Sequence, residues 1–245
     1  MDNVAIQLSG VSKSYPGFEL EDVSFQLPGG YIMGLVGPNG AGKTTIIRIM
    51  MNLARADSGQ VSIFGLDNVA HENEVKRRIG YVPEHHNFYD EMTVGWMARF
   101  VRQYYPSWDQ SYFDALAARF GIDVNKKAGA LSKGNRSKLS LALAMAHRPE
   151  LLILDEPTSG LDPVVRRDLL AELLDFMGDG ERSVLFSTHI TSDLDRVADY
   201  ITIIVDGQIH ASDEKDVLLE RARKDEPTAS IEDIVISAAR GGEAR

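Results

Sequence analysis

The chain has 245 residues, no cysteine and a formal net charge of −10 at pH 7. That length allows one large α/β domain with a full hydrophobic core, or a core domain with a small appendage. The acidic balance argues against a general nucleic-acid binder, and the lack of cysteine excludes disulfides and thiolate metal sites.

We expect neither a leader peptide nor a membrane span in this sequence. Residues 1–8 lack the basic start and the apolar core of a signal peptide. The best apolar stretches, 139–146 and 151–154, fall short of the roughly 20 residues that cross a bilayer. The polypeptide is therefore expected to be soluble by itself.

The first predicted elements form an antiparallel β layer. Residues 4–8 and 23–27 alternate between apolar and polar side chains, as half-buried strands do. A turn at 13–17 and a Pro-Gly-Gly reversal at 28–30 punctuate them. Residue type alone leaves two interpretations of Tyr15 about equally open: a ring that covers the edge of the sheet, or a ring stacked on a base.

Residues 37–45 fit the phosphate-binding pattern G-x-x-x-x-G-K-[ST] without a gap. An apolar run at 31–36 predicts a strand before them, and residues 46–50 predict a helix after them, which is the context that this pattern requires. The nine residues are Gly37, Pro38, Asn39, Gly40, Ala41, Gly42, Lys43, Thr44 and Thr45.

Each part of this loop has a predicted task. Its glycines let the turn direct backbone N–H groups inward, and the helix start adds the positive end of its dipole. The Lys43 ammonium supplies a full charge to the β- and γ-phosphates, and the Thr44 hydroxyl can hold Mg²⁺. A glycine-rich turn that merely links a strand to a helix would not need this Lys-Thr pair, so the sequence predicts a nucleotide site.

Strands are predicted next at 59–65 and 77–83, and the second leads into a loop with Glu84, His85 and His86. Paired histidines beside a carboxylate suggest a metal site. Adjacent side chains on an extended segment point to opposite faces, however, and no further His or Cys stands near in sequence. A polar loop is therefore the favoured interpretation.

Residues 93–147 are expected to form a helical insert. Apolar and aromatic side chains recur at three- to four-residue spacing at 96–104 and 113–120. A third helix is predicted at 132–145, with Ser132 at its N-cap. The aromatic stripe is interpreted as core rather than as a ligand box, although spare apolar surface on such an insert is also a docking place.

The apolar run 151–156 ends in Asp155 and Glu156, as expected of a parallel strand buried on both faces. Ligands of α/β sheets collect at such strand ends, so these two carboxylates are candidate site residues. The other predicted elements are a helix at 163–177, a strand at 183–187 before His189, a hairpin of 200–205 and 208–211, and a charged helical segment 212–245 split at Pro227, with a frayed end at 241–245.

The ordered set of these motifs resembles the ATP-binding subunit of ABC transporters over residues 4–211. One motif alone would be weak, whereas the whole series in this order is highly specific. The resemblance implies an α/β P-loop NTPase core with a mostly parallel sheet, an antiparallel β layer and an inserted α-helical subdomain. The series consists of Tyr15, 37–45, Glu84, 131–135, 151–156, 159–162 and His189.

The resemblance also implies catalytic roles for single residues. Lys43 is the phosphate lysine, Glu156 the general base for water, and His189 the γ-phosphate switch. The residues on the Mg²⁺ side are Thr44, Glu84 and Asp155.

Nucleotide contacts follow in the same way. Tyr15 is implied to stack on adenine, beside the phosphate loop 37–45. The signature residues Ser132 and Gly134 are implied to close over ATP held by an opposing subunit, so that two copies sandwich two ATP molecules in a homodimer or heterodimer.

Two motifs depart from the family pattern, at three positions. Lys133 and Asn135 stand where the signature has a second glycine and a glutamine, which reduces backbone freedom and adds a positive charge. Glu84 stands where the family has a glutamine that touches Mg²⁺. A carboxylate there adds negative charge near Asp155, which either tightens Mg²⁺ binding or raises a neighbouring pKa.

The sequence therefore predicts an ABC-type nucleotide-binding domain at 1–211, with its helical insert at 93–147, and a charged C-terminal extension at 212–245. ATP-driven dimerisation and hydrolysis would power transport through a separate integral-membrane permease, with no nucleic-acid partner. We expect a cytoplasmic protein, peripheral on the inner face of the cell membrane, in an export-type system.

The same sequence features disfavour two other function classes. A non-transport ABC ATPase acting on DNA or ribosomes usually carries coiled coils, paired cassettes or basic surfaces, and none is visible in the sequence. A generic P-loop kinase or GTPase leaves residues 131–135 and 159–162 without explanation.

Overall fold

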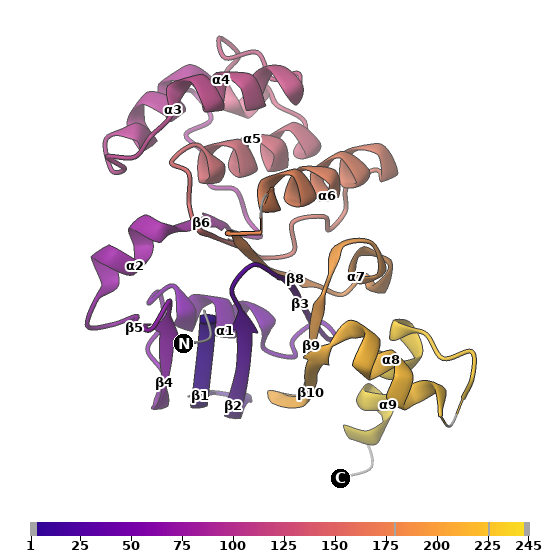
Figure 1. The fold of residues 1–245 in the computed structure, drawn as a ribbon. Helices are drawn as coiled ribbons and strands as arrows, with labels where there is room; N and C mark the ends of the chain where they lie inside the picture. Colours follow the sequence, from indigo (N-terminus) through magenta and orange to yellow (C-terminus); the bar gives the residue numbers. More distant parts are fainter. Residues whose placement is uncertain (1–3, 179, 225, 243–245) are drawn as a thin grey trace.

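Two β sheets organise the fold, and the computed structural model describes residues 4–178, 180–224 and 226–242 (Figure 1). The larger sheet consists of β10 (Gln208–Glu214), β9 (Tyr200–Val205), β3 (Ile32–Val36), β8 (Ser183–Thr188), β7 (Leu151–Leu154) and β6 (Ile79–Val82), in that spatial order. Its strands run parallel except for β10, which pairs antiparallel with β9. The predicted closing hairpin and mostly parallel sheet are confirmed.

The smaller sheet is the predicted antiparallel layer. It consists of β2 (Phe18–Pro28), β1 (Val4–Tyr15), β4 (Ser58–Ile63) and β5 (Leu66–Asp67), in that spatial order. The turn predicted at 13–17 begins too early, because Lys13 to Tyr15 still pair with β2 and the chain reverses only at Pro16 and Gly17.

One core joins the two sheets around α1 (Lys43–Met50), the helix that follows the phosphate loop. Leu8 and Phe25 of the smaller sheet, Met33 of the larger sheet, and Ile46 and Ile47 of α1 are all buried in it. Because α1 is held on both sides, the loop that precedes it is fixed relative to the ends of the parallel strands.

The helical insert lies between β6 and β7 in the chain and forms the upper layer in Figure 1. Thr93 and Asp109 accept hydrogen bonds as N-caps of the first two helices, and Ser132 caps the third as predicted, accepting one from the Asn135 amide at 3.3 Å. The insert consists of α3 (Val94–Arg102), α4 (Gln110–Arg119), the 3₁₀ helix η1 (Ala128–Ala130) and α5 (Lys133–Met145).

A second core lies between the insert and the larger sheet. It includes Phe113 of α4, Leu139 of α5 and Phe186 of β8, all nearly inaccessible to solvent. Helix α6 (Pro163–Met177) covers the same face, with Asp162 as its N-cap and Pro163 in its first turn.

Two short helices were not predicted. They are α2 (Glu72–Arg78) and α7 (Thr191–Val197). Each has seven residues, too few for a helical period to stand out, and α2 takes up the first residues of the strand predicted at 77–83.

The C-terminal part is helical in two pieces, α8 (Lys215–Arg223) and α9 (Ile231–Gly242), on either side of Pro227 as predicted. Strand β10 runs three residues past its predicted end at 211. The frayed end was predicted at 241–245; α9 extends through Gly242, and 243–245 lie outside the described residues. Within the described ranges no helix is long and apolar enough to cross a membrane.

Candidate functional site

A cavity of about 760 Å³ opens at the carboxyl ends of the parallel strands, a size that suits a small-molecule ligand. The phosphate loop forms one wall, and segments after β6, β7 and β8 form the others. Its lining consists of Gly17, Phe18, Asn39, Gly40, Gly42, Lys43, Thr44, Thr45, Glu84, Glu156, Ser159 and His189.

The phosphate loop needs glycine at two of its positions for different reasons. A Cβ on Gly37 would lie 2.0 Å from the Ile204 carbonyl oxygen of β9, so the loop passes too close to that strand for any side chain. Gly42 has φ 112°, in the left-handed region, and stands at the N-cap of α1 without a side-chain cap. The first N–H groups of α1 are therefore free to bind an anion.

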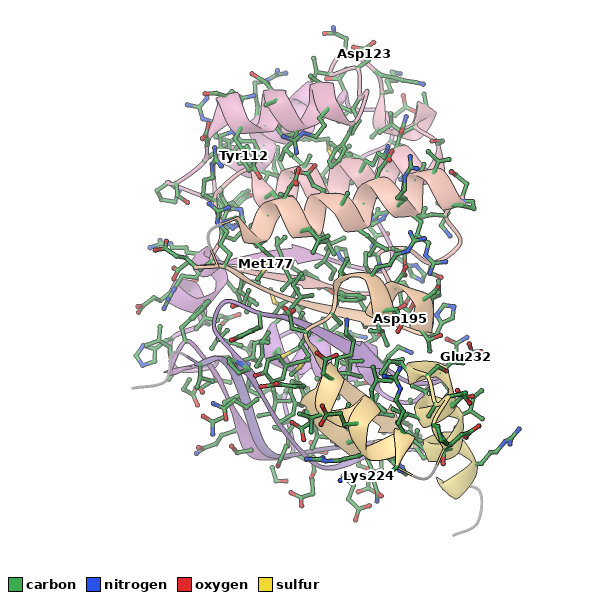
Figure 2. All side chains as sticks on the ribbon, turned by 45° about the vertical axis from the view of Figure 1, so that its right-hand side comes forward. Tyr112, Asp123, Met177, Asp195, Lys224 and Glu232 are labelled. Atoms are coloured by element: carbon green, nitrogen blue, oxygen red, sulfur yellow. The ribbon has the colours of Figure 1, made fainter. Side chains whose placement is uncertain are left out.

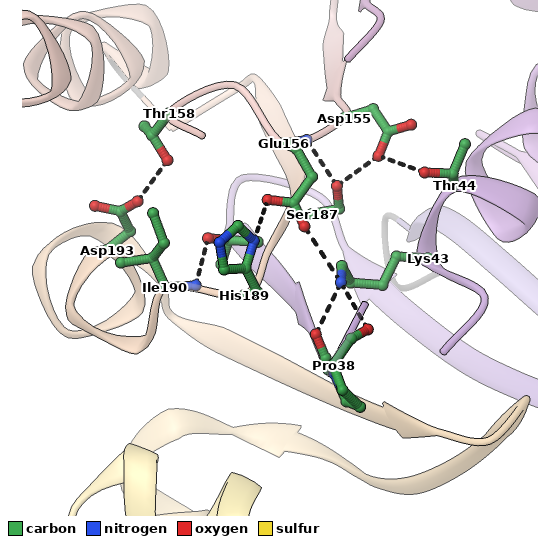
Figure 3. A network of polar contacts seen from close by, with 12 residues as sticks. Pro38, Lys43, Thr44, Asp155, Glu156, Thr158, Ser187, His189, Ile190 and Asp193 are labelled. Atoms are coloured by element: carbon green, nitrogen blue, oxygen red, sulfur yellow. Dashed lines mark hydrogen bonds and ion pairs between the residues drawn. The ribbon is translucent and has the colours of Figure 1, made fainter. Parts of the chain in front are cut away.

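The Lys43 ammonium is folded back into this loop. Its Nζ donates to the carbonyl oxygens of Gly37 at 2.8 Å and Pro38 at 3.1 Å, and it lies 3.2 Å from Glu156 Oε1 (Figure 3). The side chain is only 6% exposed. The loop thus places a buried ammonium, ion-paired with Glu156, beside the free N–H groups of α1.

Asp155 lies at the end of β7, facing α1. Its Oδ1 accepts hydrogen bonds from Ser187 Oγ at 2.7 Å and Thr44 Oγ1 at 3.2 Å (Figure 3). Burial raises the pKa of Asp155 above its usual range, and the nearby charges of Glu84 and Glu156 raise it further, against the lowering effect of the two hydroxyls.

This donor set fits a magnesium ion. Carboxylate and hydroxyl oxygens are hard ligands, and Mg²⁺ is usually held by one or two carboxylates together with substrate phosphates and water. A cation beside Asp155 would also relieve the electrostatic cost of its buried charge. Among the described residues no three His, Cys, Asp or Glu side chains are grouped to hold a metal, so the chain alone offers no closed cage.

Glu156 follows Asp155 directly, but its side chain lies beside Lys43 and His189 instead of Thr44. Its backbone has φ 48°, a left-handed conformation that costs a non-glycine residue about 1–3 kcal/mol. The amide donates to Ser187 Oγ at 2.8 Å, and Oε2 lies 2.8 Å from His189 Nδ1. Oε1 is buried without a hydrogen-bond partner, although it lies within ion-pair distance of Lys43. The contact of Oε2 with His189 thus orients the carboxylate, and Oε1 can accept a further hydrogen bond.

Seven predicted residues lie outside the cavity lining. Gly37, Pro38 and Ala41 belong to the phosphate loop, and Asp155 is buried beside Thr44. The other three are Tyr15, Ser132 and Gly134. Tyr15, at the end of β1, is 40% exposed, with Lys13 Nζ 5.3 Å from its ring centroid. Ser132 and Gly134 lie at the N-terminus of α5. Their roles toward adenine and toward a second nucleotide stay predictions.

Two lining residues, Gly17 and Phe18, were missed from the sequence, and Ser159 was identified only as part of the 159–162 motif, without a role of its own. Phe18 is paired with Tyr15 across the β1–β2 turn, which brings both side chains to one face of the hairpin, and Phe18 is the one that lines the cavity. Ser187, which binds both Asp155 and the Glu156 amide, was also missed, since nothing in a buried strand marks its hydroxyl as functional.

A second cavity of about 470 Å³ lies between the insert and the core. It is lined by α3, α5 and the loop after β6, including His86, Phe88 and His147. Beside it an aromatic ladder runs along α3, in which Trp96 stacks on Phe100 at 5.2 Å between ring centroids. Its outer members, Tyr89 and Tyr104, are largely exposed. The interpretation of the aromatic stripe as core is therefore wrong for Tyr104 and holds for Phe113, because α3 turns its aromatic side away from the second core.

Comparison with known proteins agrees with this geometry. The family model described as ABC transporter matches residues 20–159. The ABC transporter ATP-binding protein YtrB of Bacillus subtilis (strain 168) is 37% identical over 205 residues, which cover 83% of this chain and 70% of YtrB. The bacitracin transport ATP-binding protein BcrA of Bacillus licheniformis is 32% identical over 222 residues, covering 89% of this chain and 72% of BcrA.

A solved ATP-binding subunit of an ABC transporter has the same fold. It superposes with a TM-score of 0.85 at 27% sequence identity, over 95% of this chain and 98% of that one. The sheet order, the phosphate loop, the paired carboxylates after β7 and these similarities lead to one conclusion: the chain belongs to the ABC transporter family, among its ATP-binding subunits.

Proposed function

We propose that this chain binds ATP and Mg²⁺ in the 760 Å³ cavity and hydrolyses ATP to power transport through a separate integral-membrane permease. Family membership makes it an ATPase coupled to transport. The assignment of the catalytic base rests on the surroundings of Glu156. Its buried carboxylate has one oxygen in contact with His189 and the other without a hydrogen-bond partner.

Glu156 acts as the general base. Its Oε1 can accept a proton from a water molecule that attacks the terminal phosphorus in line with the leaving oxygen. An ionised carboxylate only accepts hydrogen bonds, so His189 Nδ1 carries the hydrogen of their 2.8 Å contact and fixes the direction of the base.

Lys43 and the free N–H groups of α1 stabilise the charge on the phosphates. Thr44, Asp155 and Glu84 would hold Mg²⁺ on the other side of the cavity, where the ion would neutralise phosphate charge. The Lys43 ammonium must leave Glu156 Oε1 as the phosphates arrive, because its other two partners are backbone carbonyls of the loop itself.

Two copies complete the site in this proposal. Ser132, Lys133 and Gly134 form an exposed or half-exposed helix tip outside the cavity of their own chain. Such a tip presents N–H groups that suit the γ-phosphate held by an opposing subunit. Binding of ATP would therefore drive dimerisation, and hydrolysis would loosen it.

The permease is proposed to dock on the aromatic ladder and the neighbouring cavity between the insert and the loop at 84–90. Exposed aromatic side chains grouped on one face mark interaction sites more often than isolated ones do. Docking there would place the chain at the inner face of the cell membrane, with residues 1–211 as nucleotide-binding domain and 212–245 as an extension. The Nod factor export ATP-binding protein I of Rhizobium sp. (strain N33), 32% identical over 90% of this chain and 74% of its own length, is named for export and favours an export-type system.

The test is the variant Glu156→Gln. It should bind ATP while its Mg²⁺-dependent hydrolysis falls by at least about a hundredfold, because the amide cannot accept the proton. Glu172→Gln is the matched control, since Glu172 is also a buried glutamate, paired with Arg119 away from the cavity. A normal hydrolysis rate in Glu156→Gln would show that the base is assigned wrongly.

The transport role is tested separately. Extraction of the native chain from detergent-solubilised membranes should bring down a multi-span protein in stoichiometric amount. Salt-sensitive retention on DNA or on ribosomes, without such a protein, would instead favour the non-transport alternative.

A further inference from the structure

Asp193 is a fully buried carboxylate that lies outside the cavity lining. It stands in α7 with 0% exposure. Its Oδ2 accepts a hydrogen bond from Thr158 Oγ1 at 2.7 Å, and its Oδ1 accepts one from Arg166 Nε at 2.6 Å. Both carboxylate oxygens are thus used, and the charge is compensated by a guanidinium.

The partners of Asp193 come from segments that carry the proposed catalytic residues. Thr158 follows Glu156 by two positions in the loop after β7, and Asp193 follows His189 by four. Figure 3 shows the Thr158–Asp193 contact close to the His189–Glu156 contact. One buried anion therefore ties the loop that carries the base to the helix that follows its histidine.

Arg166 adds a third segment. It lies in the second turn of α6, where its amide donates to the Asp162 carbonyl at 3.0 Å, and its Nη2 donates to Ser192 Oγ at 2.7 Å. The guanidinium thus holds two successive residues of α7, Ser192 and Asp193, against the start of α6.

The next residue of α7 is also fixed. A Cβ on Gly34 of β3 would lie 2.0 Å from Leu194 Cδ2, so Leu194 packs directly on the bare backbone of that strand. Because β3 also leads into the phosphate loop, α7 has a defined position relative to Lys43. The Thr158–Asp193 bond ties the Glu156 loop to α7, in addition to the bond from the Glu156 amide to Ser187 Oγ of β8.

We propose that Asp193, Thr158 and Arg166 are positioning residues that set the 2.8 Å contact between His189 and Glu156. This inference rests on the proposed function, in which Glu156 is the base. A carboxylate suits position 193 because the Arg166 guanidinium can only donate and the Thr158 hydroxyl donates here. An asparagine would remove the negative charge that compensates the guanidinium, and its NH₂ group could face Thr158 only if that hydroxyl turned from donor to acceptor.

The structural test measures the hydrogen bonding of the His189 ring and does not depend on catalysis. The ring ¹⁵N resonances of the native chain, assigned with His189→Ala, should show an Nδ1–H hydrogen-bonded to a carboxylate. Asp193→Asn and Thr158→Val should lose that signature, and Thr158→Ser, which keeps the hydroxyl, should retain it. Glu172→Gln is the control. It removes a different buried, ion-paired carboxylate, on α6, and should leave the signature intact.

The kinetic test asks whether that contact matters for the reaction. Asp193→Asn and Thr158→Val should lower kcat for ATP about ten- to a hundredfold, as small displacements of reacting groups do, while KM stays within about threefold. Thr158→Ser should restore kcat.

The outcomes separate the two proposals. An intact His189 signature in Asp193→Asn, or a kcat no lower than that of Glu172→Gln, would overturn the positioning role. If the His189 signature depends on Asp193 but Glu156→Gln still hydrolyses ATP at the normal rate, the proposed base is overturned instead.

Discussion

At the scale of single residues, the feature with the clearest consequence is the contact between Lys43 and Glu156. The carboxylate occupies one side of the ammonium that the phosphates of ATP must reach, at 3.2 Å and nearly without solvent. Carboxylate and phosphate therefore compete for one cation, and the strength of that competition can be measured.

We expect Glu156→Gln to bind a non-hydrolysable ATP analogue several-fold more tightly than the native chain. The amide has no charge to hold Lys43 or to repel the phosphates. Calorimetric titration of the purified chain at low protein concentration measures the affinity. An unchanged or weaker affinity would mean that the Lys43–Glu156 pair does not oppose nucleotide binding.

Glu84→Gln is the matched variant for this measurement. It removes another carboxylate from the cavity lining without touching the Lys43–Glu156 pair. Its ATPase activity should stay within about tenfold of the native rate, or about 1.4 kcal/mol in the barrier. A far larger loss in steady-state hydrolysis would give this carboxylate a catalytic duty of its own.

At the scale of elements, the insert is held to the larger sheet at the end of α5. A Cβ on Gly80 of β6 would lie 2.5 Å from the Ala144 carbonyl oxygen, so helix and strand approach to backbone contact. Beyond α5, His147 is 1% exposed, its Nε2 lies 3.1 Å from the Ile79 carbonyl oxygen, and its ring stacks on Tyr105. A carbonyl only accepts, so Nε2 carries the hydrogen.

This histidine should make stability depend on pH. Burial lowers the pKa of His147 from 6.5 to about 4, so the folded chain keeps the ring neutral while the unfolded chain protonates it first. Stability from this site is complete above pH 6.5 and falls as the pH drops towards 4, by roughly 3 kcal/mol at most.

Urea unfolding at a series of pH values tests the expectation. His147→Phe should lower stability at pH 7 and flatten the slope between pH 6.5 and 4. His86, whose pKa burial also lowers to about 4, supplies part of the remaining slope. An identical slope in His147→Phe would show that this ring is not the titrating group.

At the scale of the whole molecule, the tip of α5 that carries Lys133 is not part of the cavity lining of its own chain. In the proposed sandwich, a second copy brings such a tip over a phosphate bound at Lys43. Lys224 lies beyond α8, at the opposite end of the molecule from the insert (Figure 2).

Lys133→Glu should therefore weaken ATP-dependent dimerisation of the Glu156→Gln chain by at least about tenfold, because it turns a negative charge toward the partner's phosphates. Folding should not suffer, since an acidic residue suits the first turn of a helix. Lys224→Glu is the charge-matched control. Sedimentation with and without ATP measures the effect, and equal dimerisation by both variants would contradict the sandwich.

The sequence by itself determined the parts whose physics is local. The phosphate loop, the apolar run ending in Asp155 and Glu156, and the cap at Ser132 are each contained in a few consecutive residues. Backbone conformation and neighbouring side chains decide such features, so their pattern survives in the linear chain. The fold class followed because those motifs occur in one specific order.

Only the tertiary structure decided which distant groups meet. Thr44 reaches Asp155 across 111 positions and His189 reaches Glu156 across 33, through the spatial order of β3, β8 and β7. The same order buries Asp193 beside Thr158, and the tertiary structure makes Phe18, the cross-strand partner of Tyr15, a lining residue of the cavity. These contacts depend on long-range strand pairing and on burial, which no short stretch of sequence encodes.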